Sequence, residues 1–131
     1  MDLFPTLATL ARGKVPDDRP IDGIDVSKFL TGQQKQSGRE GFVVYMGNEV
    51  FGIKWRNWKM HFKEQDSAFD ELRTYTLPRV YNLLTDPQER DNVLFPNTWV
   101  AKAAFRILAD HTASLSATPP IAPGTSDPYK P

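Results

Sequence analysis

The sequence predicts an α+β fold, in which one long carboxy-terminal helix packs on a four-stranded antiparallel sheet. Two apolar runs with alternating residues flank a two-residue turn, a third apolar run precedes them, and an apolar stripe at helical spacing follows the last strand. A short amino-terminal helix and an extended carboxy-terminal tail complete the predicted fold. With 131 residues, the chain is large enough for one hydrophobic core.

The strongest strand pattern surrounds Arg56-Asn57. Apolar residues alternate with other residues on both sides of this pair. A tight turn at Arg56-Asn57 would place the apolar residues of both strands on one face of the sheet, in opposed pairs. These pairs are Trp55–Trp58, Ile53–Met60 and Phe51–Phe62. The residues directed to the opposite face are Lys54, Lys59, His61 and Lys63.

Residues 42–46 predict a further strand before this hairpin. A two-residue loop at Gly47-Asn48 would set Phe42 and Val44 on the same apolar face as the hairpin pairs. The three strands together form a meander.

The fourth strand is expected over residues 79–84, after a polar loop from residue 64 to residue 76. In this strand Tyr81 and Leu83 lie on one side. Residues 86–89 then carry the signature of a helix start, with an aspartate cap, a proline and a capping-box glutamate.

The long helix is expected over residues 97–113, where it can cover the apolar face of the sheet. Its stripe consists of Trp99, Val100, Ala103, Ala104, Ile107 and Leu108. The sheet and this helix form one subdomain over residues 42–116. Before it, residues 1–14 form a short helix and residues 15–41 a surface connector. After it, the proline-rich residues 117–131 form an extended tail.

Composition excludes several classes of function. Sixteen basic residues balance sixteen acidic ones without a long block of like charge, so no nucleic-acid partner is expected. The apolar runs are far shorter than the ~20 residues that span a bilayer, so a soluble chain with no membrane contact is expected. The chain has no cysteine, which excludes disulfides and thiolate chemistry. No signal segment opens it.

Several motifs occur in a particular order along the chain. They are DLFPT at 2–6, IDGID at 21–25, WRNWKMHF at 55–62, LPRVYNLLTDP at 77–87 and QERDNV at 88–93. In this order, the motifs after residue 20 resemble the carboxy-terminal subdomain of the arylsulfatase family. The DLFPT helix resembles the last helix of that family's large domain. The resemblance implies a small domain with a four-stranded antiparallel sheet and one helix, which agrees with the fold predicted from the residues.

The resemblance also implies an activity. Sulfatases cleave sulfate esters with a formylglycine that is made from a C/S-x-P-x-R motif, beside a divalent cation, calcium. This chain contains neither a cysteine nor an S-x-P-x-R sequence. We therefore assign no catalytic residue, no metal ligand and no cofactor to it. It is expected to be a carboxy-terminal fragment, inactive alone, of a hydrolase that acts on aryl or carbohydrate sulfates.

Five residues are candidates for the rim of a substrate pocket: Trp55, Arg56, Trp58, Lys59 and His61. Exposed indoles can stack on a sugar or an aromatic ester, and a basic edge can gather anionic substrates. In the competing interpretation, the tryptophans pack in the core or at a domain interface. The basic residues and His61 then lie on a solvent-exposed face of the strands.

Two partners are open at this point. One is the amino-terminal domain of the parent sulfatase, which the chain would complete. The other is a second copy of the chain, because the short first helix carries an apolar stripe that has no partner within its own segment. In that second interpretation the chain is a stand-alone interaction module. The compartment also stays open, with a periplasmic or secreted parent as the expectation from the resemblance.

Overall fold

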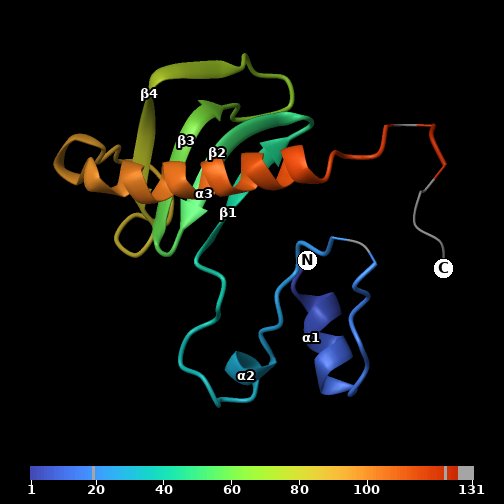
Figure 1. The fold of residues 1–131 in the computed structure, drawn as a ribbon. Coiled ribbons are helices and arrows are strands. Elements are labelled where there is room, and N and C mark those ends of the chain that lie inside the picture. The colour runs from blue at the N-terminus through green and yellow to red at the C-terminus, as the bar shows by residue number, and fades with distance from the viewer. Residues whose placement is uncertain (19, 123, 127–131) are drawn as a thin grey trace. The chain divides into compact units, whose positions relative to one another are not determined.

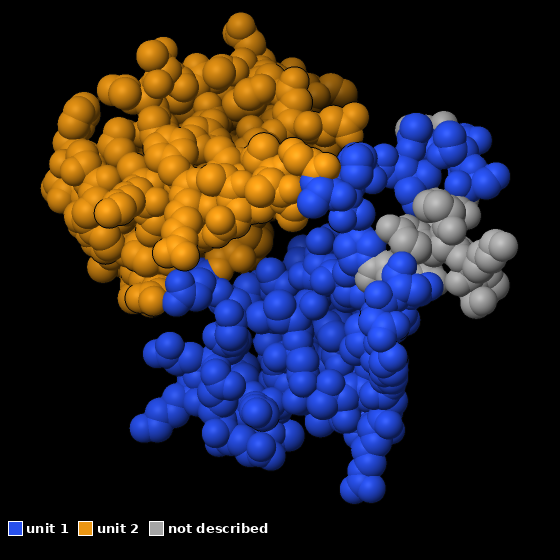
Figure 2. All heavy atoms as spheres, in the orientation of Figure 1, with its two compact units in different colours: residues 1–40, 117–131 blue, residues 41–116 orange. Residues whose placement is uncertain are grey.

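The computed structural model describes residues 1–18, 20–122 and 124–126 (Figure 1). In chain order the elements are α1 (Leu3–Leu10), α2 (Ser27–Leu30), β1 (Gly41–Met46), β2 (Glu49–Trp55), β3 (Trp58–Glu64), β4 (Arg73–Asn82), a 3-10 turn (Phe95–Asn97) and α3 (Trp99–Ala117). The chain divides into two compact units, which Figure 2 colours separately. One unit contains residues 41–116, and the other contains residues 1–40 and 117–131.

The unit of residues 41–116 has the predicted α+β fold. Its four strands are antiparallel and lie in the order β1-β2-β3-β4. Helix α3 runs across one face of this sheet (Figure 1). The core between sheet and helix contains Ile53, Met60, Val80, Leu94, Val100 and Ala104.

The β2–β3 hairpin has the predicted register around Arg56-Asn57. Trp55 is opposite Trp58, and Ile53 is opposite Met60. Arg56 adopts a φ of 51°, a left-handed conformation that the two-residue turn requires. Among the described residues, this ladder ends at the Gly52–His61 pair, so the predicted Phe51–Phe62 pair is wrong.

The face predicted for β1 is wrong, because a β-bulge shifts its register. The two-residue loop after Met46 is present, and Tyr45 pairs with Val50. Val44 then pairs with Gly52, so Phe51 is the extra residue of the bulge. As a result Val43, and not Phe42 or Val44, lies opposite Ile53 on the core face.

Strand β4 also differs from its prediction. It begins at Arg73, within the segment predicted as a loop, because a bulge between His61 and Lys63 lets the pairing continue beyond it. The strand ends at Asn82, and the backbone N–H of Leu83 donates instead to the carbonyl of Asn57, at the hairpin turn. Leu83 is therefore not a strand residue.

The segment between β4 and α3 contains no α-helix at the predicted start, residues 86–89. These residues form a turn, in which Glu89 has a φ of 58° and Asp86 accepts the backbone N–H of Asp91. The long helix begins later, at Trp99, and continues to Ala117, beyond the predicted end at residue 113. Glu89 thereby lies in an irregular segment beside the sheet.

Polar contacts link separate segments of residues 1–40. The Asp2 carboxylate accepts from Arg39 and from the backbone N–H of Ile24, and the hydroxyl of Thr6 accepts from the backbone N–H of Val26. The hydrogen bond from Arg39 is the largest cause that lowers the pKa of Asp2. In contrast Leu3, Phe4, Leu7 and Leu10 are all exposed.

Two sequence-based predictions remain predictions here. One is the division at residues 1–14, 15–41, 42–116 and 117–131, including the assignment of the first helix to a large domain. The other is the extended tail, of which residues 123 and 127–131 lie outside the described residues. Within the described residues, no helix has both the length and the apolar character to cross a membrane.

Gly52→Ala should destabilise the sheet strongly. A Cβ at Gly52 would lie 2.4 Å from the backbone oxygen of Met60, which cannot move without distorting the β2–β3 ladder. We expect a loss of about 1–3 kcal/mol in the free energy of unfolding, measured by urea titration. Gly38→Ala is the matched control, because its Cβ would make only an ordinary contact of 3.6 Å with Ile24. Equal stability of the two variants would contradict this packing.

Candidate functional site

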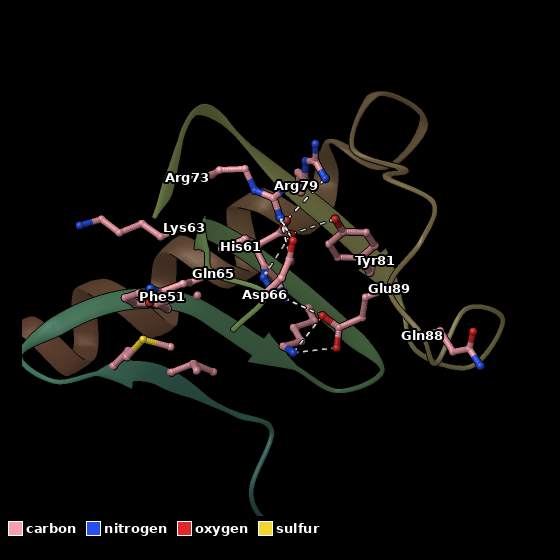
Figure 3. A pocket seen from close by; sticks show the side chains of 15 residues that line it. Phe51, His61, Lys63, Gln65, Asp66, Arg73, Arg79, Tyr81, Gln88 and Glu89 are labelled. Carbon is pink, nitrogen blue, oxygen red and sulfur yellow. Dashed lines mark hydrogen bonds and ion pairs between the residues drawn. The ribbon is translucent and has the colours of Figure 1, made fainter. Parts of the chain in front are cut away.

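The face of the sheet opposite α3 contains a pocket of about 480 Å³ (Figure 3). Its lining comes from all four strands and from the segments that follow β3 and β4. Seven charged side chains line it: Lys59, Lys63, Arg73, Arg79, Glu64, Asp66 and Glu89. The pocket exists because strand residues alternate: when Met60 and Val80 enter the core, their neighbours point to the opposite face.

Glu64 is the best anchored acid of the pocket. Its Oε2 accepts from the hydroxyl of Tyr75 at 2.6 Å, and its Oε1 accepts from the hydroxyl of Tyr81 at 3.0 Å. Burial, the largest single influence, opposes ionisation of Glu64, but the two phenolic hydrogen bonds and the nearby basic groups of His61 and Arg79 together outweigh it and lower its pKa. Burial is the main cause that raises the pKa of both tyrosines, and their hydrogen bonds to Glu64 act in the same direction. Glu64 is therefore a fixed negative charge at neutral pH.

His61 lies between Glu64 and Glu89, the two glutamates of the pocket. Its Nδ1 is 3.4 Å from Glu64 Oε1, and its Nε2 is 2.7 Å from Glu89 Oε2. The Glu89 contact lacks hydrogen-bond geometry, so Nε2 is buried without an aligned partner among the described residues. The ring also meets Tyr81 edge-on, with centroids 5.4 Å apart.

The pKa of His61 is lowered, and burial is the main cause because it penalises the charged imidazolium. The positive charge of Lys59 lowers it further, whereas Glu89 and Glu64 act in the opposite direction. Lys59 itself donates to both carboxylate oxygens of Glu89, at 2.7 and 2.9 Å. Much of the negative charge beside His61 is therefore already neutralised by a lysine.

The structure separates the five residues predicted for a pocket rim. Lys59 and His61 line this pocket. Trp55 and Trp58 lie on the α3 face, where both meet Trp99 edge-on with centroids 5.9 and 5.4 Å apart. Arg56 is in the hairpin turn, with its guanidinium 5.2 Å from the ring centroid of Trp55. A role at a substrate rim remains a prediction for all five.

Sequence reasoning missed most of the pocket. Glu64 and Arg73 lie in the segment predicted as a polar loop, and Glu89 lies in the predicted helix start. The usable signal was the alternation in the hairpin, which correctly directs Lys59, His61 and Lys63 away from the core. A sequence pattern does not show that three separate segments converge on His61.

The residues present do not fit the cofactors that the family resemblance implies. The chain has no cysteine for a formylglycine. Within residues 1–18, 20–122 and 124–126, no group of three or more histidines, aspartates or glutamates could hold a metal ion. We therefore assign no catalytic step of sulfate ester cleavage to this pocket.

Comparison with known proteins identifies the family. No family model matches the chain. Human arylsulfatase A is 32% identical over 111 residues, which cover 72% of this chain and 22% of that protein. Canine N-acetylgalactosamine-6-sulfatase is 29% identical over 119 residues, which cover 75% of this chain and 22% of that protein. The PsFucS1 sulfatase of Pseudoalteromonas sp. shares the fold with a TM-score of 0.82 at 24% identity, over 92% of this chain and 26% of that one.

A four-stranded antiparallel sheet with one covering helix and a polar outer face defines a small α+β domain. The chain belongs to the sulfatase family and corresponds to the carboxy-terminal subdomain of that family. It spans less than a quarter of the length of the curated relatives compared with it.

The lowered pKa of His61 predicts a pH dependence of stability. The unfolded chain binds a proton at His61 near pH 6.5, but the folded chain binds it only at lower pH, so acid favours unfolding in between. The contribution of neutral His61 to the free energy of unfolding is fully present above pH 6.5. It decreases as the pH falls toward the pKa of His61 in the folded chain. The loss from Glu64 begins lower, near pH 4.5.

The measurement is the free energy of unfolding from pH 8 to pH 5, for the natural chain and for His61→Gln. The natural chain should lose stability below about pH 6.5, with a shallower slope for His61→Gln. Parallel curves would show that His61 does not titrate as its burial requires.

Proposed function

We propose that this chain works as the carboxy-terminal part of a protein that hydrolyses aryl or carbohydrate sulfate esters. The observation that supports this proposal is the match to human arylsulfatase A over 72% of the chain, together with the sheet-and-helix fold. The match to N-acetylgalactosamine-6-sulfatase supports a carbohydrate sulfate as one substrate class. In this proposal the chain alone is not an enzyme.

The division of labour follows from the residues that the chain has. A formylglycine and a divalent cation, calcium in the family resemblance, would belong to other segments of the protein. This chain would supply structure and part of the wall of the substrate pocket, with Lys59 and His61 as wall residues because they line the outer face of the sheet. A periplasmic or secreted location fits the same proposal.

The purified chain should not hydrolyse a chromogenic aryl sulfate, with or without added calcium. Turnover should appear when an amino-terminal sulfatase segment that carries C-x-P-x-R, with its cysteine converted to formylglycine, is added to the chain. The measurement is release of the chromophore, and the amino-terminal segment alone is the control. Turnover by the chain alone, or no gain over that control, would contradict the proposal.

A second function, self-association as an interaction module, is favoured by the surface of α1. Leu3, Phe4, Leu7 and Leu10 are each at least half exposed, and together they form an apolar face on an eight-residue helix. Apolar surface of this kind usually marks a contact with another polypeptide. In the leading proposal that polypeptide is the rest of the sulfatase, and in this one it is a second copy.

Leu7→Glu distinguishes association through α1 from non-specific association through exposed apolar side chains. If α1 mediates self-association, the natural chain should be dimeric or larger by sedimentation velocity, and Leu7→Glu should be monomeric. Leu77→Glu is the matched control, because Leu77 on β4 is 61% exposed and Leu7 is 59% exposed. A monomeric natural chain, or equal effects of both substitutions, would exclude association through α1.

A further inference from the structure

The outer pocket contains two arginines that converge on one acid. Arg73 and Arg79 both lie on β4, and their Nη2 and Nη1 atoms are 3.8 and 3.5 Å from Glu64 Oε2. Their side chains are 49% and 41% exposed, so both guanidinium groups remain accessible from the pocket. Arg79 also stacks over the ring of Tyr75 at 4.5 Å, which restricts its orientation. A planar guanidinium held in this way suits recognition of a carboxylate or a sulfate.

Asp66 shows where an anionic group fits. Both of its carboxylate oxygens are 2.8 Å from Nη2 of Arg73. The Asp66 side chain is 70% exposed, so solvent screens this ion pair and its contribution to stability is small. The pocket therefore contains a weakly held carboxylate of the chain itself, in a position from which a ligand anion can displace it.

The opposite part of the pocket suits hydroxyl groups. There the Lys59–Glu89 pair offers a carboxylate that can accept from hydroxyls and an ammonium group that can donate to them. Phe51 contributes aromatic surface to the lining, against which a sugar ring can pack. A volume of about 480 Å³ lies within the usual range for small-molecule sites.

We infer that the outer pocket binds a saccharide that carries a sulfate or carboxylate group. The anionic group lies at Arg73 and Arg79 in place of Asp66, and the sugar hydroxyls lie beside Lys59 and Glu89. The choice of a saccharide rests on the proposed function. The position of the anion rests on the arginines and on Asp66, independently of the proposed function.

The test is a titration of the full chain, followed by 1H–15N chemical shifts. Four ligands are compared: N-acetylgalactosamine 6-sulfate, glucuronic acid, unsulfated N-acetylgalactosamine and inorganic sulfate. One or both of the anionic sugars should give saturable shifts at amides of β3 and β4. The unsulfated sugar and inorganic sulfate should each bind at least about tenfold more weakly. The unsulfated sugar lacks the anionic group, and inorganic sulfate lacks the sugar hydroxyls.

Substitutions locate the site. Arg73→Gln and Arg79→Gln should each weaken binding about tenfold, through loss of a charge-assisted contact. Asp66→Asn should strengthen it about two- to fivefold, because it removes the competing charge. Arg106→Gln is the matched control, since Arg106 on α3 is 85% exposed, pairs with Asp110 and is not part of the pocket lining. It should leave the affinity unchanged.

Three results would overturn the inference: no saturable binding of either anionic sugar, equal binding of inorganic sulfate, or equal losses in Arg106→Gln and Arg73→Gln. If an arginine variant unfolds, Asp66→Asn still tests the assigned position of the anion. Weaker or unchanged binding of the anionic sugar by Asp66→Asn would contradict that position. The titration involves no hydrolysis. If no anionic sugar binds, the proposed function as part of a sulfatase can still be correct. If complementation fails, a measured affinity for the anionic sugar still supports the site.

Discussion

The alternation of side chains across the β2–β3 hairpin is the constraint on which the rest of the structure depends. Once Ile53 is opposite Met60, Trp58, Met60 and Phe62 of β3 face the core, and Lys59 and His61 between them must point to the opposite face. Helix α3 covers only the apolar face. The polar outer face, with Lys59 and His61, is thus a direct consequence of how the core is built.

Glu64 has a comparable role on that outer face. A largely buried carboxylate is costly unless it is hydrogen-bonded, and here two tyrosine hydroxyls supply those bonds. Its charge in turn attracts Arg79 and Arg73 to the same place. The arrangement positions basic groups around a fixed acid, and it leaves their outer surfaces available to a ligand.

The two units of the chain are stabilised by different means. Residues 41–116 have a hydrophobic core, whereas residues 1–40 rely on the contacts of Asp2 and Thr6 and expose the apolar residues of α1. Apolar surface of this kind is common where a segment packs against another polypeptide. The short match to much longer sulfatases agrees with that interpretation.

The sequence by itself determined the fold class, the family and the register of the central hairpin. These properties depend on local alternation and on motif order, and both can be read along the chain. Phe42 was placed on the wrong face because one extra residue, Phe51, reverses the alternation, and a pattern of period two does not show such a bulge. The long β4 was missed because its first half is polar and pairs only beyond the bulge at His61.

The pocket was decided by tertiary structure alone. His61, Glu64 and Arg79 come from two paired strands, and Glu89 comes from an irregular segment that no periodicity predicts. Their interactions depend on distances between segments that are remote in sequence. The sequence alone shows that the chain has no cysteine, but the arrangement of charges on the outer face depends on the folded chain.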